Sequence, residues 1–199
     1  MCPKVTHQYK ENIKNKIIES SISTFSKYGY DKSRMDDIAK TANLSKGTIY
    51  LYFKNKEELF NAISERNTNE LKNQLSKLFQ NNDNDNDLIT RIQNFYEDFN
   101  DQGYRMFFEI IAESSRNKIL KQLLYQERKK ILGIVIDYLN ILKEKGYIRK
   151  DIESTEIAYG FVSLYDGLKI NKLLGVKEDQ NKNTWSRIVK TIFTGINHI

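Results

Sequence analysis

The stretch SRMDDIAKTANLSKGTIYLYFKNKEELF, residues Ser33–Phe60, decides the fold of this chain. It reads as two short helices joined by a tight turn and followed by the start of a third helix. Asn43 lies at the turn, where a residue that tolerates positive φ is expected. Apolar side chains recur at helical spacing on both sides of this turn and indicate a shared buried face. These side chains are Ile38, Ala39, Ala42, Leu44, Ile49 and Phe53.

Capping residues mark where the helices of this stretch begin. Ser33 with Asp36 resembles a capping box, and Ser45 is a good N-cap for the second helix. Asn55, followed three residues later by Glu58, is expected to cap the third helix. The second helix then has a packed inner face and an outer face that can form hydrogen bonds. A short helix of this kind fits the major groove of B-DNA.

The same residues resemble the helix-turn-helix of the TetR family of bacterial and archaeal transcriptional regulators. The run GTIYLYFKNKEEL is close to the most characteristic segment of that family, and the resemblance extends over about residues 12–63. The matching residues are Met35, Ile38, Ala39, Leu44, Ser45, Gly47, Thr48, Ile49, Tyr50, Tyr52, Phe53, Lys56, Leu59 and Phe60. The resemblance implies a three-helix DNA-binding domain at residues 1–55. It implies a larger helical bundle for ligand binding and dimerisation at residues 56–199.

Composition independently favours an all-helical fold. The 199 residues include one proline and nine glycines among abundant helix-forming residues. Outside the opening stretch, helices are expected at about residues 10–28, 56–80, 88–100, 104–116, 119–145, 154–174 and 184–197. Glycines at 29, 103, 146 and 175 are expected to mark helix ends. NNDNDND at residues 81–87 reads as a turn-rich linker, and it lacks the glycine and closing glutamate of a calcium-binding EF-hand loop.

The positive charge is concentrated near the N-terminus. The chain has 32 Lys and Arg against 26 Asp and Glu, a net charge of +6. Residues 1–56 hold 11 of these basic residues and 5 of the acidic ones, so the rest of the chain is balanced. A domain that meets DNA phosphates is expected to carry such an excess.

Several other function classes are disfavoured by the sequence. The single cysteine, Cys2, allows no intrachain disulfide, and both histidines, His7 and His198, lie near the chain ends. No phosphate-binding glycine motif or metal-ligand pattern is present, so neither an enzyme nor a cofactor or metal site is predicted. No apolar run is long enough for a membrane span and no signal peptide opens the chain, which predicts a cytoplasmic protein with no membrane partner.

The resemblance implies which side chains meet DNA. The expected contacts to base edges and phosphates come from Ser33, Arg34, Lys46, Gly47, Thr48, Tyr50, Tyr52 and Lys56. Either tyrosine could instead be a packing residue. One short helix makes too few contacts for specific recognition, so a homodimer on a palindromic operator is expected. The candidate dimer surface comprises Val162, Asp166, Ile170, Trp185, Ile188 and Ile192, some of which could fill the core instead.

A small-molecule effector is also implied by the resemblance. Apolar side chains with one or two charged anchors are candidates to line its pocket, although an aromatic stripe can equally be core. They are Phe99, Phe107, Ile111, Leu124, Arg128, Phe161, Tyr165 and Asp166. The expected function is a ligand-responsive regulator, most simply a repressor released by an apolar or amphipathic effector. The alternative is a TetR-like DNA-binding protein without a small-molecule effector, acting as an architectural, protein-responsive or activating factor.

Overall fold

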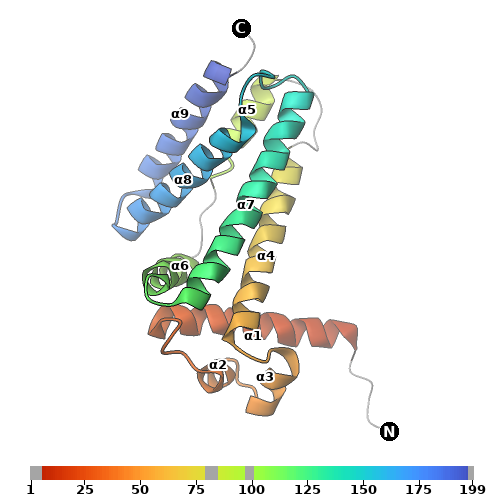
Figure 1. The fold of residues 1–199 in the computed structure, drawn as a ribbon, viewed down its shortest axis with the longest axis vertical. Helices are drawn as coiled ribbons and strands as arrows, with labels where there is room; N and C mark the ends of the chain where they lie inside the picture. Colours follow the sequence, from red (N-terminus) through yellow and green to blue (C-terminus); the bar gives the residue numbers. More distant parts are fainter. Residues whose placement is uncertain (1–5, 79–84, 97–100, 197–199) are drawn as a thin grey trace. The chain divides into compact units, whose positions relative to one another are not determined.

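A computed structural model describes residues 6–78, 85–96 and 101–196. Within these ranges the chain forms helices and no strands, as predicted (Figure 1). The helices are α1 (His7–Tyr28), α2 (Met35–Thr41), α3 (Lys46–Tyr52), α4 (Lys56–Lys77), α5 (Asp85–Gln93), α6 (Asp101–Ser114), α7 (Lys118–Glu144), α8 (Ser154–Leu173) and α9 (Glu178–Ile196).

The helices pack as two compact units. The first unit consists of the described residues of Met1–Asn67 and Phe99–Gln126, and the second of those of Thr68–Asp98 and Glu127–Ile199. The division of the chain at residue 55 or 56 stays a prediction, drawn from the extent of the resemblance.

Each unit has its own apolar core. In the first unit α1, α2, α3, α4, α6 and α7 contribute side chains that include Ile17, Phe25, Ile38, Ile49, Leu59, Ile110 and Leu120. In the second unit α5, α7, α8 and α9 contribute side chains that include Leu88, Leu139, Ala158, Phe161, Leu168, Trp185 and Val189. Burial of these apolar surfaces is the main force that holds each unit together.

Local signals set several helix ends. The Thr6 hydroxyl accepts a hydrogen bond from the Tyr9 N–H at 3.2 Å, so α1 begins earlier than periodicity predicts. Gly29 ends α1 with φ 77°, and Gly146 and Gly175 follow α7 and α8 with φ 82° and 87°, as expected. Gly103 does not end a helix; it is the third residue of α6. The predicted linker lies partly outside the described residues, and its last three residues already belong to α5.

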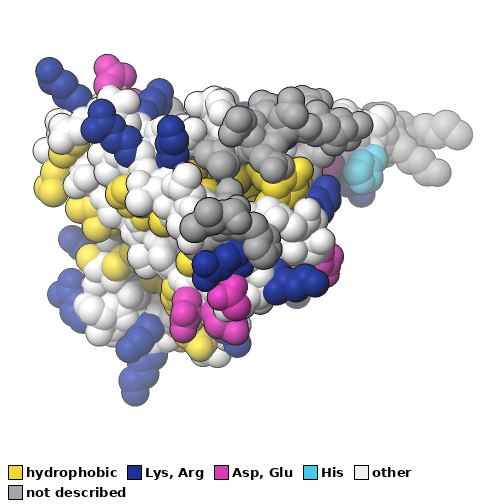
Figure 2. All heavy atoms as spheres, turned by 90° about the horizontal axis from the view of Figure 1, so that it is seen from above, with side chains coloured by type: hydrophobic (Ala, Val, Ile, Leu, Met, Phe, Trp, Pro, Cys, Tyr) yellow, Lys and Arg dark blue, Asp and Glu magenta, His cyan; other side chains and the backbone are white. Residues whose placement is uncertain are grey.

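The described helices are not membrane spans. None is both long enough and apolar enough to cross a bilayer within the ranges given above. On the face seen in Figure 2, Lys and Arg side chains stand apart from one another, with Asp and Glu among them.

Candidate nucleic-acid interface

The inner face of α2 and α3 is packed into the core of the first unit. Ile38 and Ile49 are fully buried, and Ala39 and Phe53 are nearly so. They contact a cluster that includes residues of α1 and α4, which fixes how α3 is rotated about its own axis. The predicted buried face is therefore confirmed.

The turn between α2 and α3 depends on Asn43. Asn43 has φ 50°, the single positive φ of a non-glycine residue in the described chain. The following N–H, of Leu44, donates to the Ala39 carbonyl oxygen at 3.0 Å and closes the turn. Asparagine tolerates this left-handed conformation better than most residues do, as the sequence predicted.

Side-chain caps start α3 and α4 where they were predicted. The Ser45 hydroxyl accepts from the Thr48 N–H at 3.0 Å, and the Asn55 side-chain oxygen accepts from the Glu58 N–H at 2.8 Å. Each cap satisfies a backbone donor that the first turn of a helix leaves unpaired. The Glu58 carboxylate in turn accepts from the Lys54 N–H at 2.7 Å.

The predicted capping box of α2 is wrong by one residue. The N-cap is Arg34, whose N–H donates to the Asp37 carboxylate at 3.2 Å. Ser33 is only 2% exposed, and its hydroxyl donates to the Gly29 carbonyl oxygen at 2.6 Å. The Ser33 side chain is thus directed into the protein, which corrects its expected role as a phosphate contact.

Lys56 makes contacts inside the first unit that the sequence did not predict. Its ammonium donates to the carbonyl oxygens of Tyr30 and Asp31, at 2.6 and 3.2 Å, and lies 4.5 Å from the centre of the Tyr30 ring. Burial lowers the pKa of this ammonium, with nearby carboxylates such as Asp31 opposing the shift. Lys56 thus links the start of α4 to the α1–α2 connection, residues 29–34, and its predicted phosphate contact stays a prediction.

The outward face of α3 carries the remaining candidates from that helix. Lys46, Gly47 and Tyr50 are exposed, and Thr48 and Tyr52 are half-buried. The Lys46 ammonium lies 2.9 Å from the Asp36 carboxylate, and this hydrogen bond raises its pKa. Exposed ion pairs of this kind are weak, so a phosphate can compete for Lys46.

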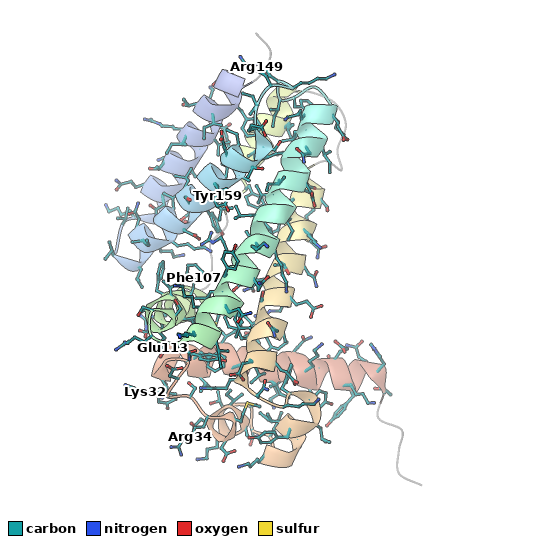
Figure 3. All side chains as sticks on the ribbon, viewed as in Figure 1. Lys32, Arg34, Phe107, Glu113, Arg149 and Tyr159 are labelled. Carbon is teal, nitrogen blue, oxygen red and sulfur yellow. The ribbon has the colours of Figure 1, made fainter. Side chains whose placement is uncertain are left out.

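More positive charge flanks the start of α2. Lys32 and Arg34 are exposed in the segment before this helix (Figure 3). The sequence singled out Arg34 and left Lys32 aside, although both belong to the same run of basic residues.

Leu51 is a surface residue that the sequence reasoning missed. It is 84% exposed, the most exposed of the large apolar side chains described. The available signal was its position: two residues after buried Ile49 on a helix, Leu51 must point away from the core.

The sequence also did not predict two hydrogen bonds that hold the α1–α2 connection, residues 29–34. The Glu113 carboxylate at the end of α6 accepts a hydrogen bond from the Asp31 N–H at 3.0 Å. Asn117 donates from its side-chain amide to the Asp31 carboxylate at 2.9 Å. Glu113 is marked in Figure 3. No local pattern could have revealed these contacts, because their partners lie more than 80 residues apart in the chain.

The effector candidates are divided between the two units. Phe107, Ile111 and Leu124 belong to the first, and Phe161, Tyr165, Arg128 and Asp166 to the second, while Phe99 lies outside the described residues. Phe107 is half-buried edge-on to Phe108, Leu124 packs on the first core, and Ile111 is exposed.

In the second unit the candidates adjoin a half-buried cluster of charges. Arg128 forms a salt bridge with Asp166, whose carboxylate also lies 4.0 Å from the Lys169 ammonium. Burial lowers the pKa of Lys169 to about 8, with Asp166 opposing the shift, and burial raises the pKa of Glu127. Phe161 and Tyr165 contact Trp185 with ring centres 6.0 Å away.

Two of the six dimer candidates are core residues. Trp185 is 4% exposed, and its indole N–H donates to the Ile92 carbonyl oxygen at 3.0 Å. Val162 is buried in the same core. Both side chains are buried in the core of the second unit, which corrects their assignment to a dimer surface. Ile170 is exposed, whereas Asp166, Ile188 and Ile192 are half-buried.

This arrangement defines a class of protein. A helix with a fully packed inner face, held by a tight turn against a supporting helix, presents polar and basic side chains outward. That is the geometry of a helix-turn-helix DNA-binding protein.

Comparison with known proteins identifies the family. Residues 17–63 match the model of the bacterial regulatory proteins of the tetR family. The uncharacterized HTH-type transcriptional regulator YfiR of Bacillus subtilis is 25% identical over 180 residues, which cover 87% of this chain and 86% of YfiR. The chain belongs to the TetR family of transcriptional regulators. Since members of this family are regulators, the prediction that the chain is not an enzyme is confirmed.

Other similarities are shorter or more distant. The biofilm operon icaADBC HTH-type negative transcriptional regulator IcaR of Staphylococcus epidermidis is 44% identical over 48 residues, 24% of this chain and 26% of IcaR. A TetR-family regulator structure from Syntrophomonas wolfei superposes with a TM-score of 0.78, covering 94% of this chain and 97% of that one at 16% identity. The second similarity supports the fold.

Proposed function

We propose that this protein binds a palindromic DNA operator as a homodimer and represses transcription until a small effector releases it. The observation that carries the proposal is the rotation of α3: Ile49 is fully buried, so Lys46 and Tyr50 point outward. Tyr50 is 43% exposed. A helix held in this way can enter the major groove without rearrangement.

Six of the eight predicted contact residues suit this task. Arg34, with its neighbour Lys32, can bind phosphates beside α2, and Lys46 can reach a phosphate or a base edge. Gly47 permits close approach, and Thr48, Tyr50 and Tyr52 supply hydroxyl groups for the DNA backbone or bases. The N-terminal excess of positive charge adds attraction that depends on salt concentration.

Exposed apolar side chains on α8 support the homodimer. Tyr159, Ile170 and Leu173 are all exposed and recur at helical spacing on one stripe of α8, with Ser163 between them. Tyr159 is marked in Figure 3. A stripe of this kind is typical of a helix that packs against a second subunit. A dimer makes twice the contacts of a single α3, and so gains the specificity that one DNA-binding domain lacks.

The release by an effector rests on the aromatic content of the second unit. The rings of Tyr96, which follows α5, and of Phe161 and Tyr165 on α8 contact Trp185. Close to them, Glu127, Arg128, Asp166 and Lys169 form a cluster of two acidic and two basic side chains. These surroundings suit an apolar or amphipathic ligand better than a strongly anionic one. Repression is favoured by the similarity of 48 residues of this chain to the negative regulator IcaR. A DNA-binding regulator of this kind is expected to act in the cytoplasm.

Selection of DNA fragments from a random library by the purified protein tests the proposal. The expected result is an inverted repeat with half-sites separated by about one helical turn or more. Compounds that displace the protein from this repeat would then identify the effector class. Recovery of no preferred sequence, with binding lost at modest salt, would contradict the proposed function.

A further inference from the structure

The centre of the outward face of α3 is apolar. At about 100° per residue, Gly47 and Leu51 lie one turn apart and nearly opposite buried Ile49. The polar candidates Lys46 and Tyr50 flank this ridge on one side, and Thr48 and Tyr52 on the other. Leu51 is therefore the side chain that projects furthest along the direction in which α3 would approach DNA.

Gly47 has no internal reason to be glycine. Its φ is not positive, and a Cβ added there would meet nothing closer than the Ser45 hydroxyl at 3.8 Å. Glycine inside a helix costs about 1 kcal/mol relative to alanine. On the outward face of α3, the absence of a side chain at Gly47 leaves room for another molecule to come close to the helix backbone. The outward face of α3 thus has open space at Gly47 and, one turn later, a projecting side chain at Leu51.

Single exposed leucines are common on protein surfaces and need no explanation by themselves. Leu51 differs because polar and basic residues of a DNA-binding face surround it. In the major groove, base edges offer hydrogen-bonding groups that a leucine cannot satisfy. The apolar group they offer is the C5 methyl of thymine.

We propose that Leu51 reads thymine by packing against its methyl group, and that Gly47 lets the α3 backbone approach closely enough for this contact. The proposal rests on the proposed function, since it requires a sequence-specific operator. It makes Leu51 a specificity-determining residue, whereas the neighbouring cations contribute mainly to affinity.

The test removes the methyl group without altering any hydrogen bond. Each thymine of the selected half-site is replaced in turn by deoxyuridine, in both half-sites at once, and binding is measured by fluorescence anisotropy at reduced salt. One thymine is expected to respond, with wild-type affinity falling about 4-fold per half-site, or roughly 15-fold in all, the factor for losing one buried methyl group. The Leu51→Ala protein is expected to bind the thymine and deoxyuridine duplexes equally. The Leu51→Met protein is expected to keep much of the preference for thymine.

Leu174→Ala is the matched control, because Leu174 is also a highly exposed leucine but follows α8. It should keep the wild-type ratio between thymine and deoxyuridine duplexes. An unchanged ratio in Leu51→Ala, or a selected repeat in which no thymine responds, overturns the assignment while leaving the proposed function intact. Selection of no sequence by the wild-type protein overturns both.

Discussion

Replacement of Gly29 by alanine tests how the α1–α2 connection is held. Gly29 has φ 77° and ψ 161°, a region that is almost restricted to glycine and costs about 1 to 3 kcal/mol for other residues. An added Cβ would lie 2.5 Å from one oxygen of the Glu113 carboxylate, so that carboxylate must move. Its other oxygen then loses the hydrogen bond from the Asp31 N–H, a further cost of about 1 kcal/mol.

Gly29→Ala is therefore expected to lower the free energy of unfolding by about 2 to 4 kcal/mol, measured by urea unfolding followed by circular dichroism. In a Glu113→Ala background the same change should cost about 1 kcal/mol less, because the obstructing carboxylate is already gone. Gly146→Ala is the control: Gly146 also has a positive φ of 82°, but its surroundings are open. Gly146→Ala should lower the free energy of unfolding by the same amount in the wild-type and the Glu113→Ala backgrounds. Equal costs of Gly29→Ala with and without Glu113 would refute the steric part of the reasoning.

Three further changes test other parts of the molecule. Tyr50→Ala should weaken operator binding by about 1 to 3 kcal/mol without changing the thermal midpoint, and normal binding would remove Tyr50 from the contact set. Lys56→Met should lower the free energy of unfolding by about 1 to 3 kcal/mol through loss of its bonds to two carbonyl oxygens, whereas Lys54→Met, at an exposed lysine, should have little effect. Because burial lowers the pKa of Lys169 to about 8, the unfolded chain holds this proton more tightly, and wild-type stability should rise relative to Lys169→Met between pH 8 and 10.5. The rise is at most about 3 kcal/mol; a flat difference in urea midpoints across this range would contradict the burial of the ammonium.

The exposure of the candidate DNA contacts was only partly predictable. Tyr50 and Lys46 are exposed as expected, because their distance from buried Ile49 along α3 sets the direction in which they point. Ser33 is buried and bonds to the Gly29 carbonyl oxygen, and Lys56 bonds to the Tyr30 carbonyl oxygen, neither of which the sequence predicted. Whether a polar side chain meets solvent or an internal carbonyl depends on neighbours that local periodicity does not describe. The exposure of Leu51 was overlooked because no apolar residue was considered as a candidate DNA contact.

The sequence by itself determined the helix-turn-helix. Its signals are local: the caps at Ser45 and Asn55, the turn at Asn43 and the apolar spacing around Ile38 each act within about one helical turn. The tertiary structure decided which candidates are core and which connections are held from a distance. Trp185 bonds to Ile92, 93 residues away, and Glu113 bonds to Asp31, 82 residues away. Such contacts form only when separate helices pack, because burial depends on which surfaces meet and not on the order of residues within one helix.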